Sequence, residues 1–245
     1  MRPCRADFVF SKPLDAADGT NRCSEGVAAD AAALRADEAT VTAVGELREI
    51  FLTRKECLVH GDLHTGSIMV PTAAVTPVAT PGGADSAEGA RRYAKMIDAE
   101  FAHFGCAAFD VGVFVAHLLF AWFAAEGEGP RTSIEGMVRD AWAAYTHAVQ
   151  AAEPSPLPSG AALAETLALT AGFAGCELIR RVIGAAHVDD LESLAPPERK
   201  LAAERSALAA GRRLVTRRDS LAQEGIDALL ACCGTHGGTA QDAAA

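Results

Sequence analysis

Residues 58–70 read Leu58-Val59-His60-Gly61-Asp62-Leu63-His64-Thr65-Gly66-Ser67-Ile68-Met69-Val70, and they indicate more about the fold than any other segment. Two short apolar runs, residues 57–59 and 68–70, lie on either side of a polar loop. Runs of this length are too short for helices and predict buried strands. The segment therefore predicts a small β hairpin whose loop carries Asp62.

The loop itself indicates a class of chemistry. A strand followed by His60-Gly61-Asp62, a polar Ser67 five positions later and a second strand resembles the catalytic loop of kinase-like phosphotransferases. In those enzymes the Asp accepts or orients the proton of the substrate hydroxyl, and the later polar side chain faces the metal. Phosphoryl transfer depends on positioning and charge neutralisation, so an anchored Asp beside a metal suffices. The alternative is a polar turn in which Asp62 is only structural.

An acidic pair follows in residues 96–101, Met96-Ile97-Asp98-Ala99-Glu100-Phe101. The apolar start predicts a short strand that ends at Asp98. Alternate residues at a strand end point the same way, so Asp98 and Glu100 are expected side by side. Two carboxylates suit Mg²⁺ held against a triphosphate. The alternative is a solvated strand edge.

The rest of the chain predicts a mainly α fold in one domain. Apolar residues recur at helical spacing in six segments: residues 37–55, 108–125, 132–152, 160–185, 196–217 and 219–231. We expect residues 1–38 to be irregular, 39–231 to form the domain, 71–94 to be a low-complexity insertion and 232–245 a frayed tail.

Composition narrows the function classes. Among 245 residues, the net charge of -10 disfavours nucleic acid as a partner. The seven cysteines are odd in number and irregularly spaced, which indicates a reducing compartment, so we expect a cytoplasmic protein. The longest apolar run, residues 111–125, falls short of the roughly 20 residues of a membrane span. It predicts a core helix and no membrane association.

Four motifs together resemble the methylthioribose kinases, a family in the aminoglycoside phosphotransferase branch of the protein-kinase-like fold. They are HGDLHTGSIMV (60–70), IDAEF (97–101), FGCAAFDVG (104–112) and ELIRRVIGAAHV (177–188). The resemblance covers about residues 8–230. It implies an ATP- and Mg²⁺-dependent enzyme that phosphorylates the anomeric hydroxyl of methylthioribose in methionine salvage. Members of this family tend to pair as homodimers.

The resemblance also implies roles for the acidic and polar residues of the two motifs already described. Asp62 would be the catalytic base that contacts the sugar hydroxyl. Asp98 and Glu100 would hold Mg²⁺ and the phosphates of ATP. Ser67 stands where the wider family has a metal-facing Asn, so it would act as a weaker ligand or through water.

Further residues have implied substrate or supporting roles. Arg180 and Arg181 would recognise methylthioribose with their guanidinium groups. They lie about 100° apart on a helix, so we expect one to face substrate and the other to pair with a surface carboxylate. His60 would orient the loop through hydrogen bonds. Asp110 would either cap the helix that begins near residue 109 or brace the catalytic loop.

The chain also departs from the family pattern. A kinase of this fold has a β-rich N-terminal lobe with a glycine-rich loop and a strand lysine, and neither is visible before residue 60. We therefore expect the helical C-terminal lobe alone. Two alternatives stay open: a phosphotransferase for another small alcohol, of aminoglycoside or choline type, and a non-catalytic lobe that only binds.

Overall fold

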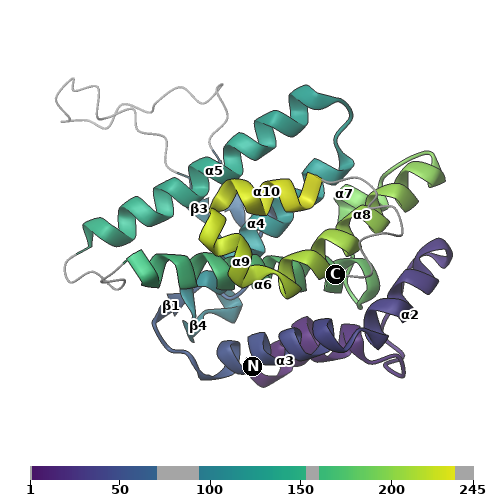
Figure 1. Ribbon diagram of the computed structural model, residues 1–245, viewed down its shortest axis with the longest axis horizontal. Coiled ribbons are helices and arrows are strands. Elements are labelled where there is room, and N and C mark those ends of the chain that lie inside the picture. The colour runs from purple at the N-terminus through teal and green to yellow at the C-terminus, as the bar shows by residue number, and fades with distance from the viewer. Residues whose placement is uncertain (1, 71–93, 153–159, 235–245) are drawn as a thin grey trace, which may run out of the picture.

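The computed structural model describes residues 2–70, 94–152 and 160–234, and it is mainly helical (Figure 1). The helices are α1 (Arg2–Ala6), α2 (Ala28–Ala36), α3 (Glu38–Thr53), α4 (Ala107–Ala124), α5 (Glu128–Ala151), α6 (Gly160–Ile183), α7 (Asp189–Glu192), α8 (Pro197–Thr216), α9 (Arg218–Glu224) and α10 (Ile226–Gly234). The strands are β1 (Cys57–Val59), β2 (Ile68–Met69), β3 (Lys95–Met96) and β4 (His103–Gly105). The predicted mainly α fold class is confirmed.

Helix α6 forms the centre of the molecule and packs against α4 on one side and α8 on another (Figure 1). Close packing depends on small residues where α6 meets α8: a Cβ on Gly175 would lie 2.6 Å from the carbonyl oxygen of Gly211. Helix α4 is apolar on nearly all sides because it is buried on nearly all sides. Nearly all of the buried apolar side chains belong to one hydrophobic cluster.

Two helices, Ala107–Ala124 and Ala162–Ile183, are long and apolar enough to cross a membrane. However, 67% and 78% of these segments are buried inside the protein. Such burial is the property of core helices in a soluble protein, and the prediction of a core helix at residues 111–125 agrees with it.

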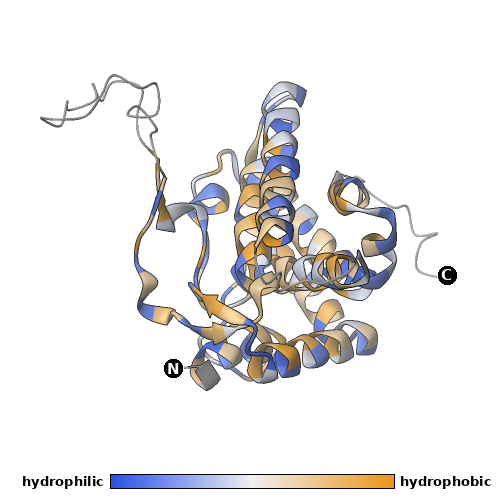
Figure 2. Cartoon of the chain, turned by 90° about the vertical axis from the view of Figure 1, so that its left-hand side faces the viewer, coloured by the Kyte–Doolittle hydropathy of each residue, from blue (hydrophilic) through white to orange (hydrophobic). Residues whose placement is uncertain are grey.

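The strands pair differently from the predicted hairpin. β1 pairs antiparallel with β4, which places Leu58 opposite Phe104, and β2 pairs antiparallel with β3, which places Ile68 opposite Met96. The prediction that residues 57–59 and 68–70 pair with each other in a single hairpin is therefore wrong. The loop between these strands turns each toward its own partner, and β4 was too short to predict. The β1–β4 pair is largely apolar, yet it lies at the surface (Figure 2).

The prediction that residues 1–38 are irregular is wrong. This segment contains α1, a π-helical turn (Asp7–Ser11), two 3₁₀ turns (Lys12–Leu14 and Glu25–Val27) and α2. The residues that favour turns, Asp15, Asp18, Gly19 and Asn21, do lie in the loop that follows the first 3₁₀ turn. The segments on either side of this loop become helical because their apolar residues, such as Phe10 and Leu34, are buried in the core.

The predicted helix over residues 219–231 is divided in two. Gly225, with φ of 95°, ends α9 and begins the turn into α10. The predicted insertion at residues 71–94 and the tail at 232–245 lie almost wholly outside the described residues, and the domain boundaries stay a prediction.

Candidate active site

The His60-Gly61-Asp62 loop is held against the turn that contains Phe101. Gly61 has φ of 82°, a left-handed conformation that favours glycine. A Cβ on Gly61 would lie 2.4 Å from the carbonyl oxygen of Phe101. Only glycine lets the loop approach this turn so closely.

Asp110, in the first turn of α4, fixes the start of the loop. Its carboxylate accepts hydrogen bonds from the backbone N–H of His60 and, at 2.9 Å, from that of Gly61. Burial raises the pKa of the Asp110 carboxyl, and the two backbone hydrogen bonds oppose that rise without cancelling it. The side chain caps no helix. Of the two roles expected for Asp110, the structure has the brace.

His60 and Ser67 connect the loop to its surroundings. The Nδ1 atom of His60 accepts from the backbone N–H of Asp62, and its Nε2 donates to the carbonyl oxygen of Ile97 at 2.8 Å. These are the contacts of a residue that orients the loop. The buried Ser67 hydroxyl donates to the backbone carbonyl of Asp62 at 3.1 Å. Ser67 thus closes the loop, and its role toward a metal stays a prediction.

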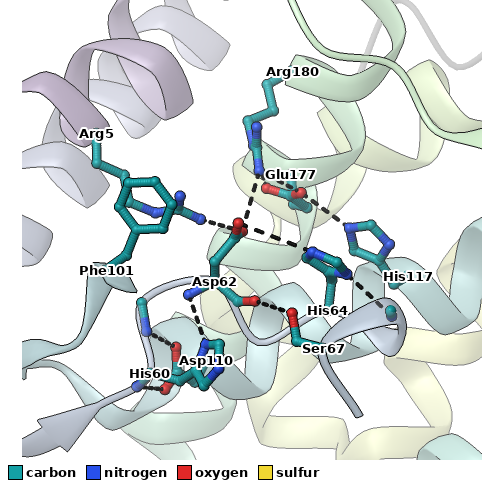
Figure 3. A network of polar contacts seen from close by, with 12 residues as sticks. Arg5, His60, Asp62, His64, Ser67, Phe101, Asp110, His117, Glu177 and Arg180 are labelled. Atoms are coloured by element: carbon teal, nitrogen blue, oxygen red, sulfur yellow. Dashed lines mark hydrogen bonds and ion pairs between the residues drawn. The ribbon is translucent and has the colours of Figure 1, made fainter. Parts of the chain in front are cut away.

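The Asp62 carboxylate lies between positively charged groups (Figure 3). Its Oδ1 atom forms an ion pair with the guanidinium of Arg5 from α1, and Nη2 of Arg180 lies 3.9 Å from the same oxygen. Its Oδ2 atom lies 4.0 Å from Nε2 of His64. The Asp62 side chain is 20% exposed, so a small molecule can reach it.

Glu177 on α6 holds both predicted substrate arginines. Its carboxylate is fully buried and accepts hydrogen bonds at 2.8 Å from Nη2 of Arg180 and from Nε of Arg181. Nε2 of His117 on α4 lies 3.3 Å from the same carboxylate. Burial alone would raise the pKa of the Glu177 carboxyl, but Arg180, Arg181 and His117 together hold it well below 4.5.

Both arginines lie in the last turn of α6, and their guanidinium groups meet at one carboxylate although the two residues are about 100° apart on the helix. Glu177 lies three residues before Arg180 and four before Arg181, and side chains at both spacings are neighbours on a helix surface. The expected surface carboxylate is wrong, because Glu177 has no exposed surface.

His64 lies between Asp62 and the group formed by Glu177, Arg180, Arg181 and His117. Its ring stacks on that of His117, with centroids 5.1 Å apart, and its Nδ1 accepts from the backbone N–H of Gly66. Burial lowers the pKa of His64 below 6.5, and the nearby His117 lowers it further. The ring is therefore neutral at neutral pH, with its proton on Nε2, toward Asp62.

The acidic pair lies on a turn and not on a strand end, so the geometric reason given for it is wrong. β3 ends at Met96, Asp98 is left-handed with φ of 65°, and residues Ala99–Phe101 form a 3₁₀ turn. Among the described residues, Asp98 is the one non-glycine residue with positive φ. Asp98 and Glu100 are both exposed. The turn is tied to the loop that carries Asp62, because the backbone N–H of Ile97 donates to the carbonyl of Ser67 at 3.0 Å.

The donor chemistry of this turn fits Mg²⁺, which often takes one or two carboxylates and completes its shell with water and phosphate oxygens. Within the described ranges, no group of three or more His, Cys, Asp or Glu side chains could hold a metal ion by itself. A metal held by Asp98 and Glu100 would need further oxygen ligands, such as water or phosphate oxygens.

No protein-family model matches the chain, but curated proteins do. It is 35% identical over 241 residues to a methylthioribose kinase of Pectobacterium carotovorum, covering 92% of this chain and 55% of that protein. It is 34% identical over 224 residues to the methylthioribose kinase of Geobacillus thermodenitrificans, covering 88% and 51%. The chain is a relative of the methylthioribose kinases. It spans about half the length of the curated relatives it matches.

This relationship confirms the resemblance predicted from the motifs. A third methylthioribose kinase, from Bacillus pumilus, is 32% identical over 217 residues, which cover 85% of this chain and 50% of that protein. A half-length match and the helical architecture both agree with the helical C-terminal lobe of a kinase.

The sequence did not lead us to three residues that contribute to the site around Asp62: Glu177, His117 and Arg5. The spacing of Glu177 to the two arginines could have predicted their pairing. His117 is the one ionisable residue in an apolar run, which could have indicated a polar contact inside the core. Nothing in the sequence indicated Arg5, because its partner Asp62 is 57 residues away.

Proposed function

We propose that the chain forms the catalytic and substrate-binding lobe of an S-methyl-5-thioribose kinase. In this proposal the enzyme transfers a phosphoryl group from ATP to the anomeric hydroxyl of methylthioribose, in methionine salvage, in the cytoplasm and as a homodimer. The observation that carries the proposal is the Asp62 carboxylate, reachable from solvent in a loop fixed by Asp110 and His60, in a chain related to methylthioribose kinases.

In the proposed reaction, Asp62 accepts the proton of the sugar hydroxyl and orients that oxygen toward the phosphate. The hydrogen bonds of the loop supply the positioning on which this step depends. Arg180 and Arg181 bind the sugar, with Glu177 holding both guanidinium groups at fixed positions. Because Arg180 contacts Glu177 and lies near Asp62, it joins the sugar site to the base.

Asp98 and Glu100 are the residues that would hold Mg²⁺ with the ATP phosphates. When bound, the metal neutralises negative charge on the transferring phosphoryl group. The backbone hydrogen bond between Ile97 and Ser67 keeps this turn beside the catalytic loop. Ser67 acts in the proposal by holding the Asp62 carbonyl.

The charge around Asp62 argues against an aminoglycoside or choline as substrate. Such substrates are cations, and the guanidinium groups of Arg5 and Arg180 lie at the Asp62 carboxylate. A neutral sugar avoids this repulsion. The remaining alternative, a lobe that binds methylthioribose without catalysis, is an outcome of the experiment below.

The experiment measures phosphorylation of methylthioribose with ATP and Mg²⁺ by the chain alone and by the chain joined to the N-terminal lobe of a relative. We expect turnover that falls about 10²- to 10⁴-fold in Asp62→Asn. The matched control, Asp30→Asn, removes an exposed carboxylate on α2 that pairs with Arg205, and it should leave turnover unchanged. Folded protein without turnover, or turnover indifferent to Asp62→Asn, refutes the kinase proposal. Binding of methylthioribose without turnover favours the non-catalytic lobe.

A further inference from the structure

Arg5 makes an ion pair with the candidate base Asp62, and the kinase motifs assign it no role. We propose that Arg5 is a positioning residue of this site: its guanidinium holds Oδ1 of Asp62, so that Oδ2 is the oxygen left to accept the substrate proton. This inference rests on the proposed function, since it concerns how the base of that reaction is aimed.

Arg5 is built into the site and is not a loose surface side chain. Its side chain is only 10% exposed. The guanidinium lies over the ring of Phe101, 4.7 Å from its centroid, and 5.9 Å from the centroid of Phe109. Cation–π contacts of this kind fix the plane of the guanidinium. The next residue, Ala6, is fully buried, so the backbone of α1 is anchored as well.

The two oxygens of Asp62 have different surroundings. Oδ1 faces two guanidinium groups, those of Arg5 and Arg180. Oδ2 has His64 at 4.0 Å, which is longer than a hydrogen bond. The side chain is also partly exposed, so Arg5 leaves it accessible. Arg5 therefore restricts the rotation of the carboxylate and leaves one oxygen available.

In the ion pair with Asp62, one donor of the Arg5 guanidinium has no hydrogen-bond partner among the described residues. This donor is the buried Nε atom. A buried donor without a partner is unfavourable and unusual in native structures. Arg48, the control residue of the experiment below, also has a buried Nε without a partner, so this feature does not distinguish Arg5. Arg5 is distinguished by its ion pair with Asp62 and by its position over the rings of Phe101 and Phe109.

The experiment compares Arg5→Ala and Arg5→Lys with the wild type, in whichever form of the chain turns over methylthioribose. Arg48→Ala is the matched control: Arg48 pairs with Asp7, next to α1, and has no contact with Asp62. For Arg5→Ala we expect kcat to fall about 10- to 100-fold with KM changed less than about threefold. Arg5→Lys should recover part of kcat because it keeps the charge. Millimolar guanidinium ion should raise kcat of Arg5→Ala and leave the Arg48→Ala enzyme unchanged.

Several results would overturn the inference. Unchanged kcat in Arg5→Ala makes Arg5 a structural bystander, and a raised kcat makes it a block on Asp62. If Arg5→Ala does not fold, Arg5→Gln keeps the packing of the side chain without its charge, and the same fall in kcat is expected. A wild-type chain that neither binds nor phosphorylates methylthioribose refutes the proposed function itself. Wild-type turnover with normal kcat in every Arg5 variant refutes only the role of Arg5.

Discussion

Replacing Glu177 with Ala should destabilise the protein more than any exposed charge change. The carboxylate is fully buried and is shared by Arg180, Arg181 and His117. Removing it leaves the guanidinium of Arg180, whose side chain is 9% exposed, inside the protein without its main partner. Asp62, at 3.9 Å from Arg180, could compensate in part.

The magnitude follows from this burial. Removing one partner of a buried ion pair costs about 3–5 kcal/mol, because the other charge stays desolvated. For a protein of this size, 1 kcal/mol corresponds to about 2–4 °C in Tm. We therefore expect Glu177→Ala to lose about 3–5 kcal/mol of unfolding free energy and about 6–20 °C in Tm. Glu177→Gln keeps the volume and one acceptor oxygen, and it should lose less.

The assay is urea unfolding at pH 7, followed by circular dichroism, with the slope of free energy against urea checked for change. Asp30→Asn is the control, because Asp30 and Arg205 form an exposed pair worth about 0–1 kcal/mol. The reasoning is refuted if Glu177→Ala loses no more stability than this control. That result would mean that the two arginines need no buried carboxylate.

Three further predictions concern the same loop and its support. Because Glu177 has a pKa held well below 4.5, its stabilisation is complete above that pH and is lost as pH falls below it; the stability of wild type and Glu177→Gln should converge in acid, and parallel curves would contradict this. Asp110→Asn replaces one acceptor with a donor, so the Gly61 amide should exchange hydrogen faster and stability should fall by about 1–3 kcal/mol; unchanged exchange would argue against the brace. Gly61→Ala should lose at least about 1–3 kcal/mol from its positive φ alone, whereas Gly45→Ala, on an open face of α3, should be neutral or stabilising; equal effects would refute the close approach.

The sequence predicted the helices well because each buries one face, and apolar residues at three- and four-residue spacing report that burial directly. The prediction succeeded for α3, α4 and α6, whose bounds differ from those expected by only one or two residues. It failed for residues 1–38, because residues that favour turns lie between two helices, α1 and α2, that are stabilised by tertiary packing and show no sustained apolar period. It also failed for Asp98 and Glu100, because a left-handed residue changes the direction of a chain in a way that alternation cannot reveal.

The motif of the candidate site could be predicted from the sequence, but the residues from other helices that contact it could not. A sequence pattern reports contacts between residues that lie close together in the chain, and it does not report contacts between distant ones. The loop hydrogen bonds of Asp62 join residues two to five positions apart, whereas its brace and its charged neighbours come from α1, α4 and α6. Those long-range contacts give the site its electrostatic character. The guanidinium groups of Arg5, Arg180 and Arg181 surround the carboxylates of Asp62 and Glu177. The carboxylates of Asp110, Asp98 and Glu100 belong to the same loop and the adjoining turn, so the site as a whole has no excess of positive charge. In the proposed function, the two guanidinium groups beside Asp62 favour a neutral sugar over a cationic substrate, because a cation at this carboxylate would meet like charges at close range.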